Sequence, residues 1–169
     1  MANFFAEGEC KVRPHFKAHK TPEIARRQLA AGSCTGLTCA TVGEAEIAAA
    51  FCEDFLIANE VIGADKCARV AKLAKLIDIK IAIDSDEGLD QIAAAASAAA
   101  TAVGVVVDVD VGLPRCGIAP GGPALALARR AADTAGVGLR GVMGYEGHVV
   151  GIEDREKRSA RALEAMERG

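Results

Sequence analysis

The sequence predicts an α/β fold with a parallel sheet, and two observations support this prediction. Short runs rich in β-forming residues are each followed by a helical pattern, and their first residues lie 18 to 36 positions apart, as in successive βα units. The region Val103–Val111 is rich in valine, which is typical of a strand buried on both faces. The six predicted strands are Lys11–Lys17, Gly36–Ala40, Asp54–Asn59, Ile79–Asp84, Val103–Val111 and Leu139–Tyr145.

Helix start signals stand between these strands. Thr21, Pro22 and Glu23 fit the N-cap and the first two positions of a helix. Thr41 and Glu44 form a capping box, in which the Glu44 side chain is expected to bond back to Thr41. Further helices are predicted at Lys66–Leu76 after Gly63-Ala64-Asp65, after the acidic Asp84-Ser85-Asp86-Glu87 start, and at Ala124–Ala135 before Gly136.

Two parallel architectures are compatible with this pattern, a doubly wound open sheet and a (β/α)₈ barrel. No G-x-G-x-x-G sequence follows the first strand, which argues against the dinucleotide-binding open sheet. Polar residues at the carboxyl ends of several strands favour the barrel, whose enzymes build their sites there. These residues are Lys17, Asn59, Glu60, Asp84, Arg115 and Tyr145 to His148. Because about six units are present, we predict a (β/α) barrel of TIM type that is incomplete in this chain.

Composition narrows the class of protein. The chain has 169 residues, which predicts a single domain, and 51% hydrophobic with 4% aromatic residues, which predicts an aliphatic core. A net charge of -3 argues against a nucleic-acid partner. The six cysteines include no C-x-x-C pair, which favours free thiols in a cytoplasmic protein. No apolar run reaches the ~18 residues of a membrane span, and no signal peptide is visible.

The most informative motif lies near the start of the chain. Between Arg13 and Thr21 the sequence holds two lysines and two histidines, and Pro14 forces extended geometry on Arg13. Lys17 then falls at the end of a predicted strand, where a lysine that bonds a cofactor could sit. His15 and His19 have the i, i+4 spacing of a zinc site on a helix, but Pro14 argues against a helix. Hydrogen bonding around a cofactor is the preferred interpretation for both histidines.

Four stretches give the chain a resemblance to a known family. They are Arg13-Pro14-His15-Phe16-Lys17-Ala18-His19-Lys20, Asn59-Glu60-Val61, Val109-Asp110-Val111-Gly112 through Arg115-Cys116-Gly117, and Gly144-Tyr145-Glu146-Gly147-His148. They resemble, in order, the motifs R-P-H-x-K-x-H-K, N-E-V, D-V-G-x-x-R-x-G and Y-x-G-H. The family is that of the fold type III pyridoxal-phosphate enzymes, in the branch of D-threonine aldolase and D-serine dehydratase. Its barrel is the one of the alanine racemase N-terminal domain.

The resemblance implies a set of site residues. Lys17 forms the Schiff base with pyridoxal 5'-phosphate, and burial among its neighbours is expected to lower the pKa of its amine. Catalytic roles fall to Lys17, His15 and His148, and cofactor contacts to Lys17, His19, Arg115, Tyr145 and Asn59. No metal ligand is expected in this chain, because full-length relatives bind a divalent metal through a C-terminal β domain.

Structural interpretations stay open beside the functional ones. Arg115 fits a surface arginine after a turn, and Tyr145 fits a core tyrosine with a solvated hydroxyl. Lys20 is either a second cation near the substrate or a solvated residue. Asp108 and Asp110 either orient Lys17 or Arg115 or simply line the end of a strand.

The resemblance also implies the activity and the extent of the domain. Residues 1–169 are expected to form one pyridoxal-phosphate-binding barrel domain, truncated at both ends and without the C-terminal β domain. The expected activity is that of a lyase acting on D-amino acids with a β-hydroxyl, of the D-threonine aldolase or D-serine dehydratase type. The alternatives are a non-catalytic pyridoxal-phosphate-binding module and an inactive fragment. Fold type III enzymes usually dimerise, so a homodimer is also expected.

Overall fold

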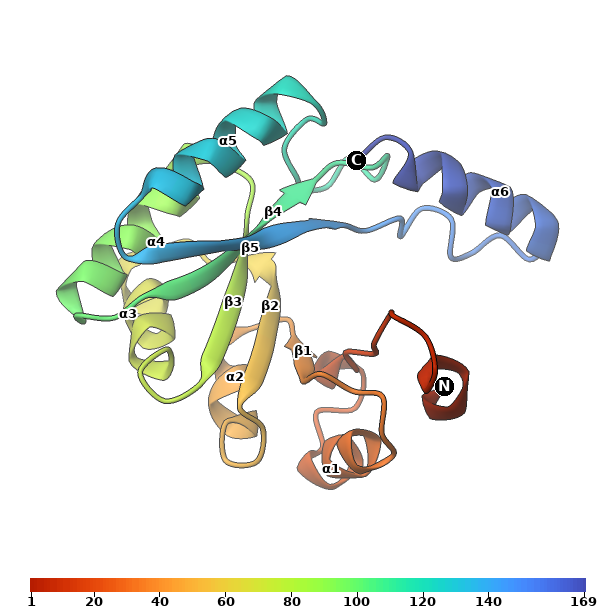
Figure 1. The fold of residues 1–169 in the computed structure, drawn as a ribbon, viewed down its shortest axis with the longest axis horizontal. Coiled ribbons are helices and arrows are strands. Elements are labelled where there is room, and N and C mark those ends of the chain that lie inside the picture. Colours follow the sequence, from red (N-terminus) through yellow and green to blue (C-terminus); the bar gives the residue numbers. More distant parts are fainter.

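A parallel five-stranded sheet forms the centre of the computed structural model, which describes residues 1–169. The strands are β1 (Leu37–Cys39), β2 (Asp54–Glu60), β3 (Asp78–Ile83), β4 (Val103–Val109) and β5 (Val137–Gly144). They are hydrogen-bonded in the order β1-β2-β3-β4-β5, which is also their order along the chain (Figure 1). The α-helices are α1 (Pro22–Ala30), α2 (Val42–Ala48), α3 (Ala64–Leu73), α4 (Asp86–Ala98), α5 (Gly122–Asp133) and α6 (Arg155–Met166).

The strand order decides between the two predicted architectures. A doubly wound sheet reverses its strand order and carries helices on both faces, whereas a barrel adds each strand beside the previous one. Here the order never reverses, and helices α2 to α5 cover one face of the sheet (Figure 1). The predicted (β/α) barrel is therefore confirmed as an open, partial barrel wall.

The hydrophobic core lies between the sheet and these helices. Every second residue of the central strands is buried against the helices; these include Phe55, Ile57, Ile79, Ile81, Ile83, Val103, Val105, Val107 and Val109. Because side chains alternate along a strand, the intervening residues face the opposite, concave side of the sheet. On β4, for example, Gly104, Val106 and Asp108 face this side. The strand β4 is nevertheless buried along its whole length, as predicted for a strand covered on both faces, and the concave side carries polar residues such as Asp108.

The first predicted strand is much shorter than expected. The segment beside β1 makes only two isolated parallel bridges, Val12 with Cys34 and His15 with Thr38, and then turns into a 3-10 helix at Phe16–Ala18. Pro14 explains the interruption, since it has no N–H to donate to the neighbouring strand. Its carbonyl still accepts the Thr38 N–H at 2.8 Å.

The helix starts follow the sequence closely. Thr21 precedes Pro22 at the first position of α1, as predicted, and the Thr41 hydroxyl accepts the Glu44 N–H at 3.2 Å. The Glu44 carboxylate accepts the Ala40 N–H at 2.8 Å, so it reaches one residue further back than the predicted bond to Thr41. The helices predicted to begin at residues 66 and 124 begin two residues earlier, at Ala64 and Gly122.

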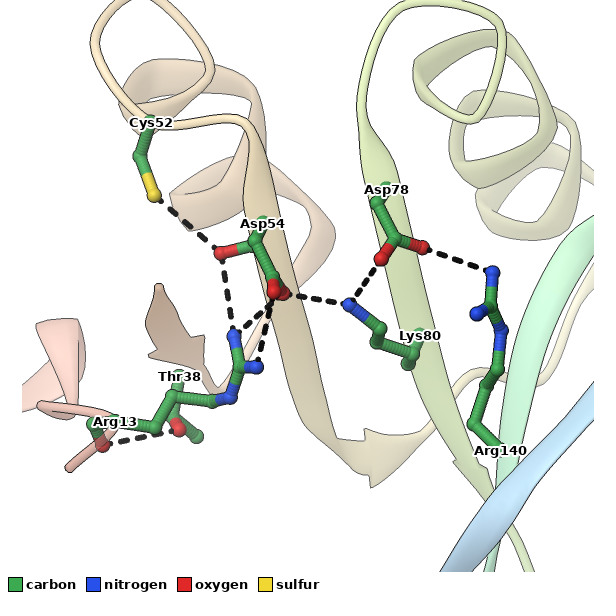
Figure 2. Close-up of polar contacts among 7 residues, drawn as sticks. All are labelled: Arg13, Thr38, Cys52, Asp54, Asp78, Lys80 and Arg140. Carbon is green, nitrogen blue, oxygen red and sulfur yellow. Dashed lines mark hydrogen bonds and ion pairs between the residues drawn. The ribbon is translucent and has the colours of Figure 1, made fainter. Parts of the chain in front are cut away.

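A ladder of ion pairs crosses the amino ends of the strands. Arg13 donates to both carboxylate oxygens of Asp54, at 2.6 and 3.2 Å. Lys80 bridges Asp54 and Asp78 with two contacts of 2.6 Å, and Arg140 donates to Asp78 at 3.2 Å (Figure 2). Burial opposes the ionisation of Asp54, but the hydrogen bonds from Arg13 and Lys80 outweigh it, so the pKa of Asp54 lies below its usual range. The ladder joins the first segment to β2, β3 and β5.

Two further observations concern sequence predictions. All six cysteines are free, as predicted. None of the helices combines the length and the apolar character that crossing a bilayer requires.

Candidate active site

Lys17 lies on the 3-10 turn that follows the first segment, beside the edge strand β1. Phe16, with 1% of its surface exposed, anchors this turn in the core. The Lys17 side chain points out of the core and is exposed, so the prediction that its amine is buried is wrong for this chain. The physical reason is that β1 is the last strand on this side, and no further element covers the turn.

The two histidines of the motif have different surroundings. His15 is extended and half-buried, and its Nδ1 accepts the Lys17 N–H at 3.4 Å. Burial, and then the charge of Lys17, lower the pKa of His15, which keeps its ring neutral near pH 7. His19 accepts the Thr21 N–H through Nδ1 at 3.1 Å, and its Nε2 lies 3.0 Å from Oε1 of Gln28. Both nitrogens of His19 are therefore engaged in holding the turn onto α1.

Lys20 pairs with Glu44 of α2. The Glu44 side chain is only 6% exposed, and its burial is offset by the hydrogen bond from Lys20, so the pKa of Glu44 is lowered. Lys20 itself adopts a left-handed conformation with φ 51°. Its side chain is 64% exposed, which agrees with the solvated residue that the sequence allowed, and the contact with Glu44 also makes Lys20 an anchor of the Lys17 turn.

Asn59 joins the carboxyl ends of β1 and β2. Its side-chain amide donates to the Ala40 carbonyl at 3.2 Å, and its side-chain oxygen accepts the Glu60 N–H at 3.1 Å. The pairing of β2 with β3 is irregular between Ile57 and Glu60. The exposed Asn59 side chain thus stabilises the bend that turns Glu60 toward the sheet interior.

Arg115 and Tyr145 meet at the far side of the site. The Arg115 guanidinium lies 5.5 Å from the centre of the Tyr145 ring, and both residues are exposed. Gly147 packs against this ring so closely that a Cβ there would collide with it. Arg115 is thus a surface arginine, as one interpretation allowed, whereas the core-tyrosine interpretation is wrong because Tyr145 is 44% exposed, and the two residues form a cation–aromatic contact at the rim.

His148 occupies the same rim. It is exposed and lines a pocket of about 250 Å³ between the loop after β4 and helix α6. Strands β2 to β4 lie between the edge near Lys17 and the edge near His148. The structure therefore groups the predicted residues in two sets, one at each edge of the open sheet.

The central part of the site contains a cluster that the sequence did not single out. A carboxylate oxygen of Glu60, one of Asp108 and the thiol of Cys116 lie within 4.8 Å of one another. Asp108 is 5% exposed, and burial, together with the adjacent Glu60, raises its pKa to about 6. The sequence signal that could have pointed to this cluster was Asp108 itself, an aspartate between valines at a strand position that faces away from the helices. That Glu60 is the partner of Asp108 could not be inferred, because the irregular pairing of β2 near Glu60 does not follow from the alternation of side chains along a regular strand.

Comparison with known proteins identifies the family of this chain. Residues 1–168 match the family model described as alanine racemase, N-terminal domain. The chain belongs to this family. It is 42% identical over 149 residues to a D-threonine aldolase of Arthrobacter sp., an alignment covering 88% of this chain and 39% of that protein.

Solved structures of the alanine racemase N-terminal domain family agree with the fold. The D-threonine aldolase from Filomicrobium marinum superimposes with a TM-score of 0.95 at 34% identity, covering 99% of this chain and 45% of that one. The D-threo-3-hydroxyaspartate dehydratase from Delftia sp. HT23 gives 0.79 at 29% identity, covering 96% and 45%. The predicted membership of the fold type III enzymes, in the D-threonine aldolase branch, is confirmed. The chain spans less than half the length of these relatives.

The side chains present fit the part of pyridoxal 5'-phosphate that they would hold. An exposed primary amine at Lys17 is the group that an aldehyde requires. Arg115 offers a cation for an anionic oxygen, and the Tyr145 ring offers an aromatic face beside it.

Proposed function

We propose that this chain forms the pyridoxal-phosphate-binding part of a lyase that acts on D-amino acids with a β-hydroxyl. The observation that carries the proposal is the Lys17 turn, an exposed lysine held in place by three anchors, in a chain with a TM-score of 0.95 to a D-threonine aldolase. The anchors are the buried Phe16, the engaged His19 and the Lys20–Glu44 ion pair. The relatives named above act on D-threonine or on 3-hydroxyaspartate, and both substrates carry a hydroxyl on the β carbon.

The residues of this chain have distinct tasks in such a reaction. Bound pyridoxal phosphate would supply an electron sink for negative charge developing at the Cα of the substrate. Lys17 would hold this group through its amine. His15, kept neutral by its lowered pKa, can accept a proton beside Lys17. Arg115 orients an anionic oxygen, and His148 is the candidate for proton transfer at the opposite edge.

The substrate and the metal belong to the proposal as well. Cleavage of D-threonine to glycine and acetaldehyde and dehydration of D-serine are the two reactions to be separated. One solved relative, a D-threo-3-hydroxyaspartate dehydratase variant, is described in a metal-free form. This supports a divalent metal at the substrate hydroxyl, with ligands that residues 1–169 do not supply. A homodimer in the cytoplasm completes the proposal, and light scattering checks the dimer.

A second candidate is a cofactor-binding segment without turnover. The observation in its favour is the placement of the predicted residues, since Lys17 and His148 lie at opposite edges of the sheet. The unpaired edge of β5 points in the same direction, because an open strand edge favours association over a defined site.

Addition of pyridoxal phosphate to the purified chain tests Lys17. The expected result is a visible absorbance band of lysine-bound cofactor, and borohydride reduction should then fix the label on the peptide that contains Lys17. Lys17→Ala should abolish both signals, whereas Lys11→Ala, at an exposed lysine without an ion pair, should leave them unchanged. A label elsewhere would refute the role of Lys17, and no label on a folded chain would refute cofactor binding by residues 1–169.

Assays of the loaded chain then separate the two candidates. With a divalent metal present, acetaldehyde from D-threonine indicates an aldolase, and pyruvate from D-serine indicates a dehydratase. A chain that carries the label on Lys17 but forms neither product is the binding segment.

A further inference from the structure

The carboxyl ends of β2 and β4 bring two acidic side chains together on the concave side of the sheet. Glu60 and Asp108 each place a carboxylate oxygen within 4.8 Å of the other and of the Cys116 thiol. Asp108 is almost fully buried, and Oε1 of Glu60 is buried without a hydrogen-bond partner. Two ionised carboxylates at this separation repel each other strongly where water is excluded. The pair therefore needs either a shared proton or a bound cation.

We propose that Glu60 and Asp108 share one proton, and that the protonation state of this pair sets the position of Cys116 and of the adjacent Arg115 against Tyr145. The contacts run in sequence from the pair to the rim. The Cys116 thiol donates to Oδ2 of Asp108 at 3.6 Å, and Arg115 precedes Cys116 in the loop after β4. The guanidinium of Arg115 then lies over the Tyr145 ring. The pair is thus connected to a predicted cofactor contact through two consecutive residues.

The Cys116 thiol is a hydrogen-bond donor in this cluster. Burial raises the pKa of Cys116, so its sulfur stays protonated when no metal is bound. A bound metal would itself deprotonate the thiol, so the addition of Mg²⁺ and Zn²⁺ in the test below separates a shared proton from a cation site. The unpartnered oxygen of Glu60 is also the acceptor that a proton on Asp108 requires.

The other charged groups around the pair set the direction of its response to pH. Asp84, at the end of β3, accepts the Gly117 N–H at 3.2 Å and adds a negative charge on this side. Arg115 and Tyr145 face the pair from the loop and from beyond β5. Burial of Asp108 and its contact with Glu60 place the loss of the shared proton near pH 6. Above this pH the two carboxylates repel each other, whereas the hydrogen bond that the Cys116 thiol donates to Asp108 strengthens, so both contacts of Asp108 change together.

Tyrosine emission provides a direct readout. Tyr145 is the single tyrosine of the chain and there is no tryptophan, so the emission reports one site beside Arg115. In a titration without cofactor or metal, we expect a change in emission with a midpoint near pH 6. Asp108→Asn should abolish this change. Glu60→Gln should move the midpoint to lower pH, because it removes the negative charge that raises the pKa of Asp108 and leaves one acceptor oxygen in place of two.

Two control variants exclude other sources of the signal. Asp133→Asn alters an exposed carboxylate at the opposite end of the sheet and should leave the midpoint unchanged. His148→Gln removes the imidazole three residues after Tyr145 and should also preserve the change.

Several results would overturn the proposal. They are a wild-type emission that is flat between about pH 4 and pH 8, a change that persists in Asp108→Asn, and a midpoint that falls as Mg²⁺ or Zn²⁺ is added, which would indicate a cation site. If circular dichroism shows that Asp108→Asn does not fold, Glu60→Gln decides alone, and an unchanged midpoint in that variant refutes the shared proton.

Discussion

Replacement of Lys80 by methionine should destabilise the chain through the two aspartates that this lysine separates. Asp54 and Asp78 occupy directly opposed positions on β2 and β3, and each accepts a contact of 2.6 Å from Lys80. Neighbouring strands lie about 5 Å apart, and two like charges at that distance repel by about 3 kcal/mol at an effective dielectric constant of about 20. In this variant Arg13 would still form its ion pair with Asp54, and Arg140 would still form its ion pair with Asp78.

Solvent reduces this cost. The side chains of Asp54 and Asp78 are 34% and 46% exposed, so water and salt screen part of the repulsion. We therefore expect Lys80→Met to lower the free energy of unfolding by about 1 to 3 kcal/mol at low salt, and by less at high salt. Urea unfolding followed by circular dichroism measures the loss without screening the charges.

A matched lysine and a double variant make the experiment decisive. Lys75→Met removes an exposed lysine without an ion pair, and should change the stability by no more than about 0.5 kcal/mol. Combining Lys80→Met with Asp78→Asn should cost less than the sum of the single changes, since one of the opposed charges is gone. The reasoning fails if Lys80→Met costs no more than Lys75→Met, or if its cost is independent of salt.

Two further predictions concern packing and pH. Gly104→Ala should cost about 1 to 3 kcal/mol, because a Cβ there would lie 2.8 Å from Cγ of Lys80 and 3.1 Å from the Ile79 carbonyl. Gly138→Ala, in the paired position on β5 with no atom within 4 Å of its Cβ, is the control, and equal costs in thermal unfolding would contradict the prediction. Glu44→Gln should cost about 1 to 3 kcal/mol at pH 7, since it weakens the bonds to Lys20 and Ala40. The pKa of Glu44 is lowered in the fold, so this contribution is present above its unfolded pKa and is lost as the pH falls through the folded value. The gap between the two proteins should then close in acid, and a gap that persists would show that the carboxylate charge is not the source.

The sequence was sufficient for most of the fold because local signals and global pattern agree. Alternating valines and isoleucines in β3 and β4 identified the strands, and Thr41 and Pro22 marked helix starts correctly. The first strand was overestimated, because the apolar residues around Pro14 resemble a strand although the proline removes a ladder bond. Register and strand order, which distinguish a barrel wall from a doubly wound sheet, depend on packing between distant segments.

The candidate site was predictable by motif and not by environment. Lys17, Arg115 and Tyr145 were identified from their neighbours in sequence. Tyr145 directly follows β5, whereas Lys17 lies on a 3-10 turn and Arg115 in the loop after β4. The exposure of Lys17 was not predictable, because it depends on what packs against this turn. The contact between Glu60 and Asp108 joins strands 48 positions apart in the chain, and no spacing rule links them.

The segregation of the core to the helix side of the sheet has a consequence for how this chain tolerates change. Residues at 55, 57, 79, 81, 83, 105 and 107 bear the packing, whereas their neighbours at 56, 58, 80, 82, 104 and 106 face the concave side. Substitutions on the helix side should therefore cost packing energy at every second position of a strand, whereas on the concave side the cost depends on local contacts, such as those of Lys80 and Gly104. Natural selection could alter the chemistry of the concave surface one position at a time, while the wall that supports it keeps the same sequence of buried residues.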